Sequence, residues 1–242
     1  MKMKIDKMRL LGILLFVLGV LVGLAFNAMS VWADLEASLF DTSLPADEAI
    51  DGIACPWIIT PGETGLVTAS IKNNTDRPIN TVIRTHISEG LVTLMREEDN
   101  RQSIQPGETA TLSYAVTAGD AVWGRFILTR VYVFPAFPMR SRAGSCGVIV
   151  AQLPGIPGWM VVLVWVGVSI ALLGGGIWLW RRRRDKLIGT ALRSLQAMLV
   201  LGAFVLAGML LSLLGAWLPA GLLLLATIIL VTAMLAYFLT IS

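Results

Sequence analysis

The chain has 242 residues, of which 56% are hydrophobic and only 14% are charged. A soluble domain of this length would expose more charged surface, so the composition excludes an ordinary soluble protein and favours a membrane protein. The net charge of +3 hides a segregation of charge. Residues 34–155 hold nine basic and fourteen acidic residues, and the rest of the chain holds ten basic and two acidic ones. Because the expected globular part is acidic, a nucleic-acid partner is not expected.

The N-terminal part predicts a membrane helix behind a basic leader. Residues 1–9 are rich in Lys and Arg, and residues 10–33 form an apolar run long enough to cross a hydrocarbon layer of about 30 Å. A cleaved signal peptide is one interpretation, because small residues near position 33 suit cleavage. The run is long for the apolar part of a signal peptide, so we favour a retained anchor.

Small residues recur on one face of this predicted helix. Gly19 and Gly23 form a GxxxG pair, and Asn27 follows at the same spacing. Such a face allows close approach of a second helix backbone, so the three residues are candidates for contact with a partner subunit. The alternative is that glycine is simply common in membrane helices.

The middle of the chain predicts a linker and then a β-domain. Residues 34–52 are acidic and without period, which predicts a linker. In residues 53–152, Thr, Val and Ile dominate and turn signals recur about every ten residues, which predicts seven short strands in an antiparallel sandwich. Within it we expect a polar loop at 97–102 and one long strand at 122–134.

Repeated turn motifs carry a resemblance to a known kind of domain. Pro-Gly-Glu-Thr occurs at 61–64 and again at 106–109, each time before an alternating run, with an Asn-rich turn at 72–78 between them. With the Cys-Pro pair at Cys55, this order resembles bacterial immunoglobulin-like, adhesion-type modules. The resemblance covers residues 53–152 and implies a sandwich without catalytic residues.

Cys55 and Cys146 are the only cysteines, and they lie near the two ends of the acidic segment. In an extracytoplasmic domain such a pair predicts one disulfide, with two unpaired buried thiols as the alternative. The Cys–Trp–Cys pattern of antibody domains is missing. We therefore expect a bridge between the first and last strands, which departs from that pattern.

An apolar loop follows the long predicted strand. It contains Phe134, Phe137 and Met139, and its prolines exclude a central strand. Exposed apolar patches often mark interfaces, so these three side chains are candidates for contact with a partner protein.

Three more apolar runs predict membrane helices at residues 157–180, 194–214 and 218–241. Between the first two lies a basic loop, residues 181–193. Its first four residues are Arg181, Arg182, Arg183 and Arg184. Arginine is costly to move through hydrocarbon, so this loop is expected in the cytoplasm, where it sets the orientation and contacts anionic lipid.

The expected fold class is therefore a membrane protein of the α plus β type. Four transmembrane helices are expected, with an extracytoplasmic antiparallel immunoglobulin-like sandwich between the first and second. The location expected is the plasma membrane, with both termini in the cytoplasm and residues 34–156 outside.

Catalytic and metal motifs do not stand out. His86 is the only histidine and has no companion ligands at metal-binding spacing, so neither a metal nor another cofactor is expected. The run Glu97, Glu98 and Asp99 could hold calcium, although such runs are commonly solvated loop tips. The predicted membrane helices contain no Asp, Glu, Lys, Arg or His, which argues against a proton or ion pathway.

These observations favour a non-enzymatic accessory or scaffold subunit in the lipid bilayer. It would bind other membrane protein subunits through its sandwich and its helix faces. A glycan- or peptide-binding ectodomain or sensor is the alternative. A membrane-embedded enzyme or transporter component would need a polar cluster that the sequence does not display.

Overall fold

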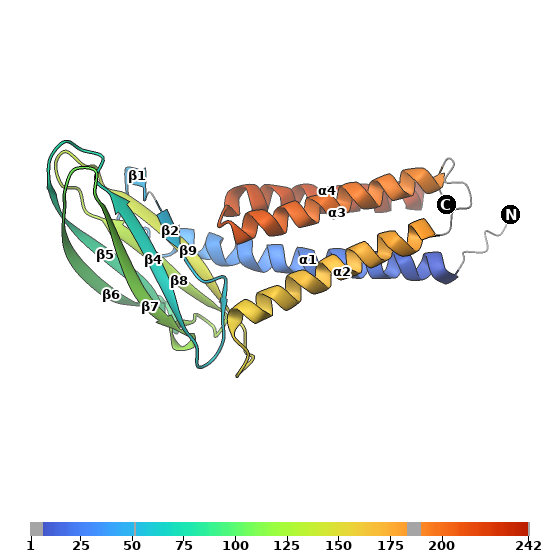
Figure 1. The fold of residues 1–242 in the computed structure, drawn as a ribbon, viewed down its shortest axis with the longest axis horizontal. Helices are drawn as coiled ribbons and strands as arrows, with labels where there is room; N and C mark the ends of the chain where they lie inside the picture. The colour runs from blue at the N-terminus through green and yellow to red at the C-terminus, as the bar shows by residue number, and fades with distance from the viewer. Residues whose placement is uncertain (1–6, 51, 183–189, 242) are drawn as a thin grey trace. The chain divides into compact units, whose positions relative to one another are not determined.

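The computed structural model describes residues 7–50, 52–182 and 190–241. They form an α plus β protein with two compact units (Figure 1). One unit is Trp32–Val162 and holds the β-structure. The other combines the chain before residue 32 with the chain after residue 162.

The described residues form four helices, as the apolar runs predict. They are α1 (Lys7–Leu39), α2 (Gly158–Arg182), α3 (Thr190–Leu213) and α4 (Trp217–Ile241). Three helical stretches are long and apolar enough to cross a membrane: Leu10–Leu39, Gly158–Arg182 and Leu192–Leu213. The apolar stretch found in α4, Trp217–Ala233, is shorter. These helices indicate insertion into a membrane.

Nine strands and a short 3₁₀ helix make up the β-unit. They are β1 (Glu48–Ala49), β2 (Gly52–Ala54), β3 (Ile58–Ile59), β4 (Thr64–Lys72), β5 (Ile79–Glu89), β6 (Leu91–Ile104), β7 (Thr109–Thr117), η1 (Ala118–Asp120), β8 (Phe126–Val133) and β9 (Arg142–Val150).

The strands form two sheets with a shared core. One sheet has the order β1-β9-β8-β5-β6, with β3 also paired to β9, and the other has the order β2-β4-β7. Side chains alternate along β4, so that Val67, Ala69 and Ile71 are buried together with Ile83 and Val131 from the larger sheet. This period of two is what the sequence shows for a half-buried strand.

Two features of the predicted sandwich are wrong. The larger sheet is mixed, because β1 and β3 run parallel to β9. Both are strands of two residues and carry no alternation from which pairing could be predicted. Residues 97–102 belong to β6 and do not form a loop. They are polar because β6 is an edge strand, where charged side chains discourage pairing with another chain.

The long strand expected at 122–134 is interrupted near its start. Trp123 and Gly124 both have positive φ, 52° and 66°, and they turn the chain before β8 begins at Phe126. A positive φ is rare for a bulky residue, so the composition of this segment gives no warning of the turn.

Candidate functional site

The disulfide links the two sheets of the sandwich. Cys55 and Cys146 are bonded to each other, with their Cα atoms 6.4 Å apart. Cys55 follows β2 of the smaller sheet, and Cys146 lies in β9 of the larger one. A disulfide persists in oxidising compartments, so its presence points to one.

The outer face of the larger sheet is covered by the end of α1. Ala33, Ala37 and Phe40 are all buried, although they lie at or beyond the end of the predicted membrane segment. The helix approaches β9 so closely that a Cβ at Gly147 would lie 2.1 Å from the Ala33 carbonyl oxygen. The Gly147 N–H donates to the Asp34 carboxylate at 3.0 Å. Only glycine at position 147 allows this approach.

The turn after α1 is hydrogen-bonded to the same sheet. Arg130 on β8 donates to the backbone oxygens of Phe40, at 3.4 Å, and Leu44, at 3.1 Å. The Tyr132 hydroxyl donates to the Pro45 oxygen at 3.2 Å. Residues 34–52 are therefore not the linker that their acidic composition predicts. We call residues 33–45 the α1 strap.

His86 contributes to the attachment of the α1 strap. Its side chain is only 7% exposed, and its Nδ1 contacts the Asp41 carboxylate. On the other side, Nε2 lies 3.5 Å from Glu97 of β6. Burial raises the pKa of Asp41, but hydrogen bonds from Ser43 and His86 outweigh it, so the net pKa is lowered. The histidine thus has a structural role: its Nδ1 bonds to the α1 strap, whereas its buried Nε2 has the Glu97 carboxylate nearby but no hydrogen-bond partner.

The carboxylate run of β6 does not converge on a cation site. Glu97 and Asp99 face Arg84, at 3.8 and 2.8 Å, whereas Glu98 pairs with Arg96 at 3.3 Å. The Arg84 guanidinium lowers the pKa of Asp99. Because successive strand residues point to opposite faces, the three carboxylates cannot gather. Across the described residues, no group of three His, Cys, Asp or Glu could hold a metal ion.

In both Pro-Gly-Glu-Thr turns the glutamate accepts a hydrogen bond from a backbone N–H of the same turn. The glutamate of the first turn also bonds to the start of α2. Glu63 accepts from the Thr60 N–H at 3.1 Å, as Glu108 does from the Gln105 N–H at 2.7 Å. Glu63 in addition accepts from the Gly158 N–H at 2.9 Å, at the start of α2. A carboxylate there stabilises unpaired N–H groups and the positive end of the helix dipole.

The predicted apolar loop presents one of its three candidate side chains to solvent. Phe137 is 86% exposed, and the guanidinium of Arg77 lies 5.8 Å from its ring centroid. Phe134 is half-buried against Tyr132, with ring centroids 4.9 Å apart. Met139 belongs to the core, because the backbone pairing of Ala136 with Met139 turns the loop inward. Met139 is therefore not available as an interface residue.

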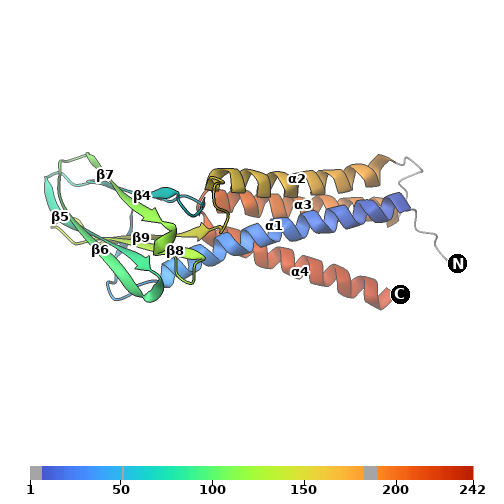
Figure 2. The ribbon, with the colours of Figure 1, turned by 90° about the horizontal axis from the view of Figure 1, so that it is seen from below.

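The small-residue face of α1 packs inside this chain's own bundle, where α1 lies beside α2 and α3 (Figure 2). A Cβ at Gly19 would lie 2.8 Å from the Leu173 nitrogen, and one at Gly23 would lie 2.4 Å from Val205. Asn27 is buried and donates to the Val205 carbonyl at 3.4 Å. The spacing indicates a packing face, but these contacts show that the face meets α2 and α3, so its assignment to a partner subunit is wrong.

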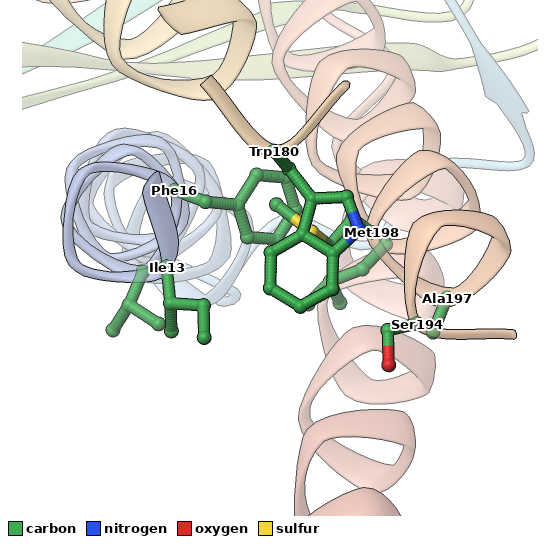
Figure 3. A pocket seen from close by; sticks show the side chains of 8 residues that line it. Ile13, Phe16, Trp180, Ser194, Ala197 and Met198 are labelled. Carbon is green, nitrogen blue, oxygen red and sulfur yellow. The ribbon is translucent and has the colours of Figure 1, made fainter. Parts of the chain in front are cut away.

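A cavity of about 240 Å³ lies among α1, α2 and α3. Figure 3 shows the rings of Phe16 and Trp180 close to Met198, with Ser194 on α3 at its rim. The Ser194 hydroxyl is the one polar side-chain group besides the indole of Trp180 among the lining residues. The cavity is lined mainly by apolar side chains, and its lining residues include no acid, no base and no metal-ligand set.

The basic stretch is partly within the described residues. Arg181 and Arg182 are exposed at the end of α2, and the Arg182 guanidinium lies 4.9 Å from the Trp178 ring centroid. Arg183 and Arg184 fall outside the described residues, as does the basic leader up to residue 6.

Comparison with known proteins assigns no family. No family description matches the chain, and no curated protein matches it. Weak structural matches exist: a Paenibacillus cycloisomaltooligosaccharide glucanotransferase (14% identity, 45% of this chain, 15% of that chain, TM-score 0.34) and the CARDB domain of the Pyrococcus furiosus PF1109 protein (14%, 42%, 90%, 0.33). A superoxide reductase from Ignicoccus hospitalis is similar at 9% identity, 41% and 79% coverage and TM-score 0.31. Likeness this weak is compatible with an immunoglobulin-like sandwich and carries no argument about function.

Proposed function

We propose that this chain is a non-catalytic, membrane-anchored accessory subunit that docks a partner protein through the tip of its sandwich. The observation that carries the proposal is Phe137, a phenyl ring 86% exposed to water beside the guanidinium of Arg77. Aromatic and arginine side chains dominate the energetics of protein interfaces. We call Phe137 and Arg77 the tip pair.

The position of the tip pair suits contact with another protein. Phe137 lies in the loop between the end of β8 and the start of β9, and β9 runs from there toward α2. The tip pair is therefore at the end of the sandwich opposite to the one that continues into α2. A partner can reach it without competing with the α1 strap or with the start of α2.

The proposal includes an orientation. The arginines after α2 favour a cytoplasmic location for that helix end, and the disulfide favours an oxidising compartment for the sandwich. Asp76 beside the tip pair has a side chain that is 83% exposed, so D76C should react with a membrane-impermeant maleimide on intact cells. Reaction only after the cells are permeabilised would show that the sandwich lies in the cytoplasm, opposite to the proposed orientation.

The helix faces give the proposal less support than their sequence suggests. Gly19, Gly23 and Asn27 are occupied by contacts within the chain. The docking role is therefore assigned to the sandwich, and the bundle serves as its anchor.

Photo-crosslinking in the native membrane tests the docking role. A benzophenone amino acid at position 137 should form one defined adduct with a second protein. The same amino acid at Ser113, exposed in the middle of β7, is the matched control and should form none. Equal adducts from both positions, or none from position 137, would contradict the proposal. Adducts to a glycan would favour the ligand-binding alternative.

A further inference from the structure

We propose that the end of the sandwich that continues into α2 rests in the interfacial layer of the lipid bilayer, with Trp123 as an inserted anchor. This inference concerns the opposite end from the tip pair and does not depend on the docking role. We call this end the sandwich base.

The sandwich base is assembled from turns that lie far apart in the sequence. The Trp123 N–H donates to the Gly90 oxygen at 3.4 Å, in the turn between β5 and β6. The Gln152 side chain donates to the Gly124 oxygen at 2.9 Å, after β9 has ended. On the other side of β9, the Ile149 N–H donates to the Trp57 oxygen at 3.1 Å. These contacts place the turns at one end of the larger sheet.

Exposed apolar side chains gather on these turns and on the adjoining first residues of β6. A polar domain surface normally scatters such groups singly, and contiguous sets mark contact with another apolar phase. The set here consists of Trp57, Leu91, Leu94, Trp123, Leu153 and Ile156, each between 40% and 60% exposed.

The depth of the sandwich base follows from its contact with α2. A Cβ at Gly158, the first residue of α2, would lie 2.0 Å from the Ile58 oxygen. Gly158 also begins an apolar stretch long enough to cross a membrane, and Trp159 on its first turn is more than half exposed. Tryptophan is enriched where membrane helices meet the head groups. The backbone beside Trp57 therefore lies at the depth where α2 enters the bilayer.

The backbone conformation of Trp123 is unusual for a bulky residue. Its φ of 52° lies in the left-handed region, which a bulky residue rarely adopts, and the residue is 60% exposed. A strained conformation persists only when its surroundings enforce it, and such strain is found at functional positions. Here the turn directs an indole outward from the sheet, with the exposed cation Arg125 two residues later.

The chemistry of the pair suits a phospholipid interface. An indole combines a large apolar body with one N–H donor, and it is most favourable where hydrocarbon meets head groups. The Arg125 guanidinium can bind a lipid phosphate beside it. Glu89, at the neighbouring turn, carries a negative charge. The proposed contact of the sandwich base with lipid therefore does not rest on an excess of positive charge.

The test uses the full chain in phosphatidylcholine nanodiscs, labelled with 5-fluorotryptophan. The ¹⁹F resonance of Trp123 is assigned with W123F. A phosphatidylcholine carrying a doxyl group at carbon 5 should abolish that resonance, and a water-soluble gadolinium chelate should leave it. The indole introduced by F137W, at the far end of the sandwich, is the matched control and should show the reverse pattern.

Each other outcome contradicts the inference. Loss of the Trp123 resonance with the chelate but not with the doxyl lipid would place the sandwich base in water. Insensitivity to both agents would show that protein covers it, from a second copy of the chain. If W123F does not fold, L153W supplies a second reporter at the sandwich base, for which the same pattern as for Trp123 is expected.

Discussion

Replacement of Gly147 by alanine should detach the α1 strap from the sheet. The added Cβ would lie 2.1 Å from the Ala33 oxygen and 2.2 Å from its carbon, and both are backbone atoms. No rotamer change can relieve such a contact. Either the helix moves away or β9 bends, and β9 is held by eight paired residues of β8. We therefore expect the helix to move.

The size of the effect follows from this overlap. Overpacking a well-packed site costs about 1–3 kcal/mol, and the upper half of that range applies because backbone must shift. Loss of about 2–3 kcal/mol corresponds to roughly 30- to 150-fold more of the detached state, since about 1.4 kcal/mol is tenfold. In the wild type, burial of the Phe40 side chain stabilises the attached strap by about 1.5–3 kcal/mol.

Thiol labelling measures the detached population. Ala37 lies within the α1 strap and is fully buried, so A37C reacts with a thiol reagent only when the strap detaches. The labelling rate should rise roughly 30- to 150-fold when G147A is added. G144A on the same strand is the matched control, because its Cβ would meet Ile50 at an ordinary 3.4 Å. Equal rates in G147A and G144A would refute the close packing of the strap.

Three further perturbations have defined outcomes. Reduction of the Cys55–Cys146 bridge, which joins residues 91 positions apart, should lower the free energy of unfolding of the sandwich by about 4–5 kcal/mol in the entropic model; a urea midpoint unchanged by reductant would count against the bridge. For D41N we expect a loss of about 1–3 kcal/mol at pH 7. The pKa of Asp41 is lowered in the folded state. The wild type therefore has this stabilisation in full at pH values above 3.8, the ordinary pKa of the carboxyl group, and loses it as the pH falls through the lowered pKa. The difference in stability between the two proteins should therefore vanish in acid. A difference that persists at low pH would show that charge is not involved. Finally, N27A removes the bond to the Val205 carbonyl and should weaken the helix bundle by about 0.6–2 kcal/mol, measured by unfolding in detergent; no change would mean that the bond contributes nothing.

Local patterns were enough for the framework of the fold. Alternation in β4 predicts its buried face, and the apolar runs predict the helices, because each of these signals is contained within one element. The disulfide between the two cysteines could be predicted from their positions and from the expected compartment of the domain. The glutamates at positions 63 and 108 mark turns that the structure contains.

Contacts between distant segments could not be predicted. Asp34 ends the apolar run in the sequence, yet α1 continues to Leu39 because Gly147, far along the chain, accepts the helix against β9. Met139 has the composition of an exposed loop residue, and only the backbone turn around it directs it to the core. The spacing of Gly19 and Gly23 indicates a packing face but cannot say which helix meets it.

The docking role is tested most directly by native mass measurement of the chain purified in mild detergent from its own membrane. Our proposal predicts that the wild type carries a second protein at fixed stoichiometry. It also predicts that F137A loses that protein, whereas S113A, altered at the exposed centre of β7, keeps it. A monodisperse wild-type monomer without any second chain, or a complex that survives F137A unchanged, would contradict the proposal.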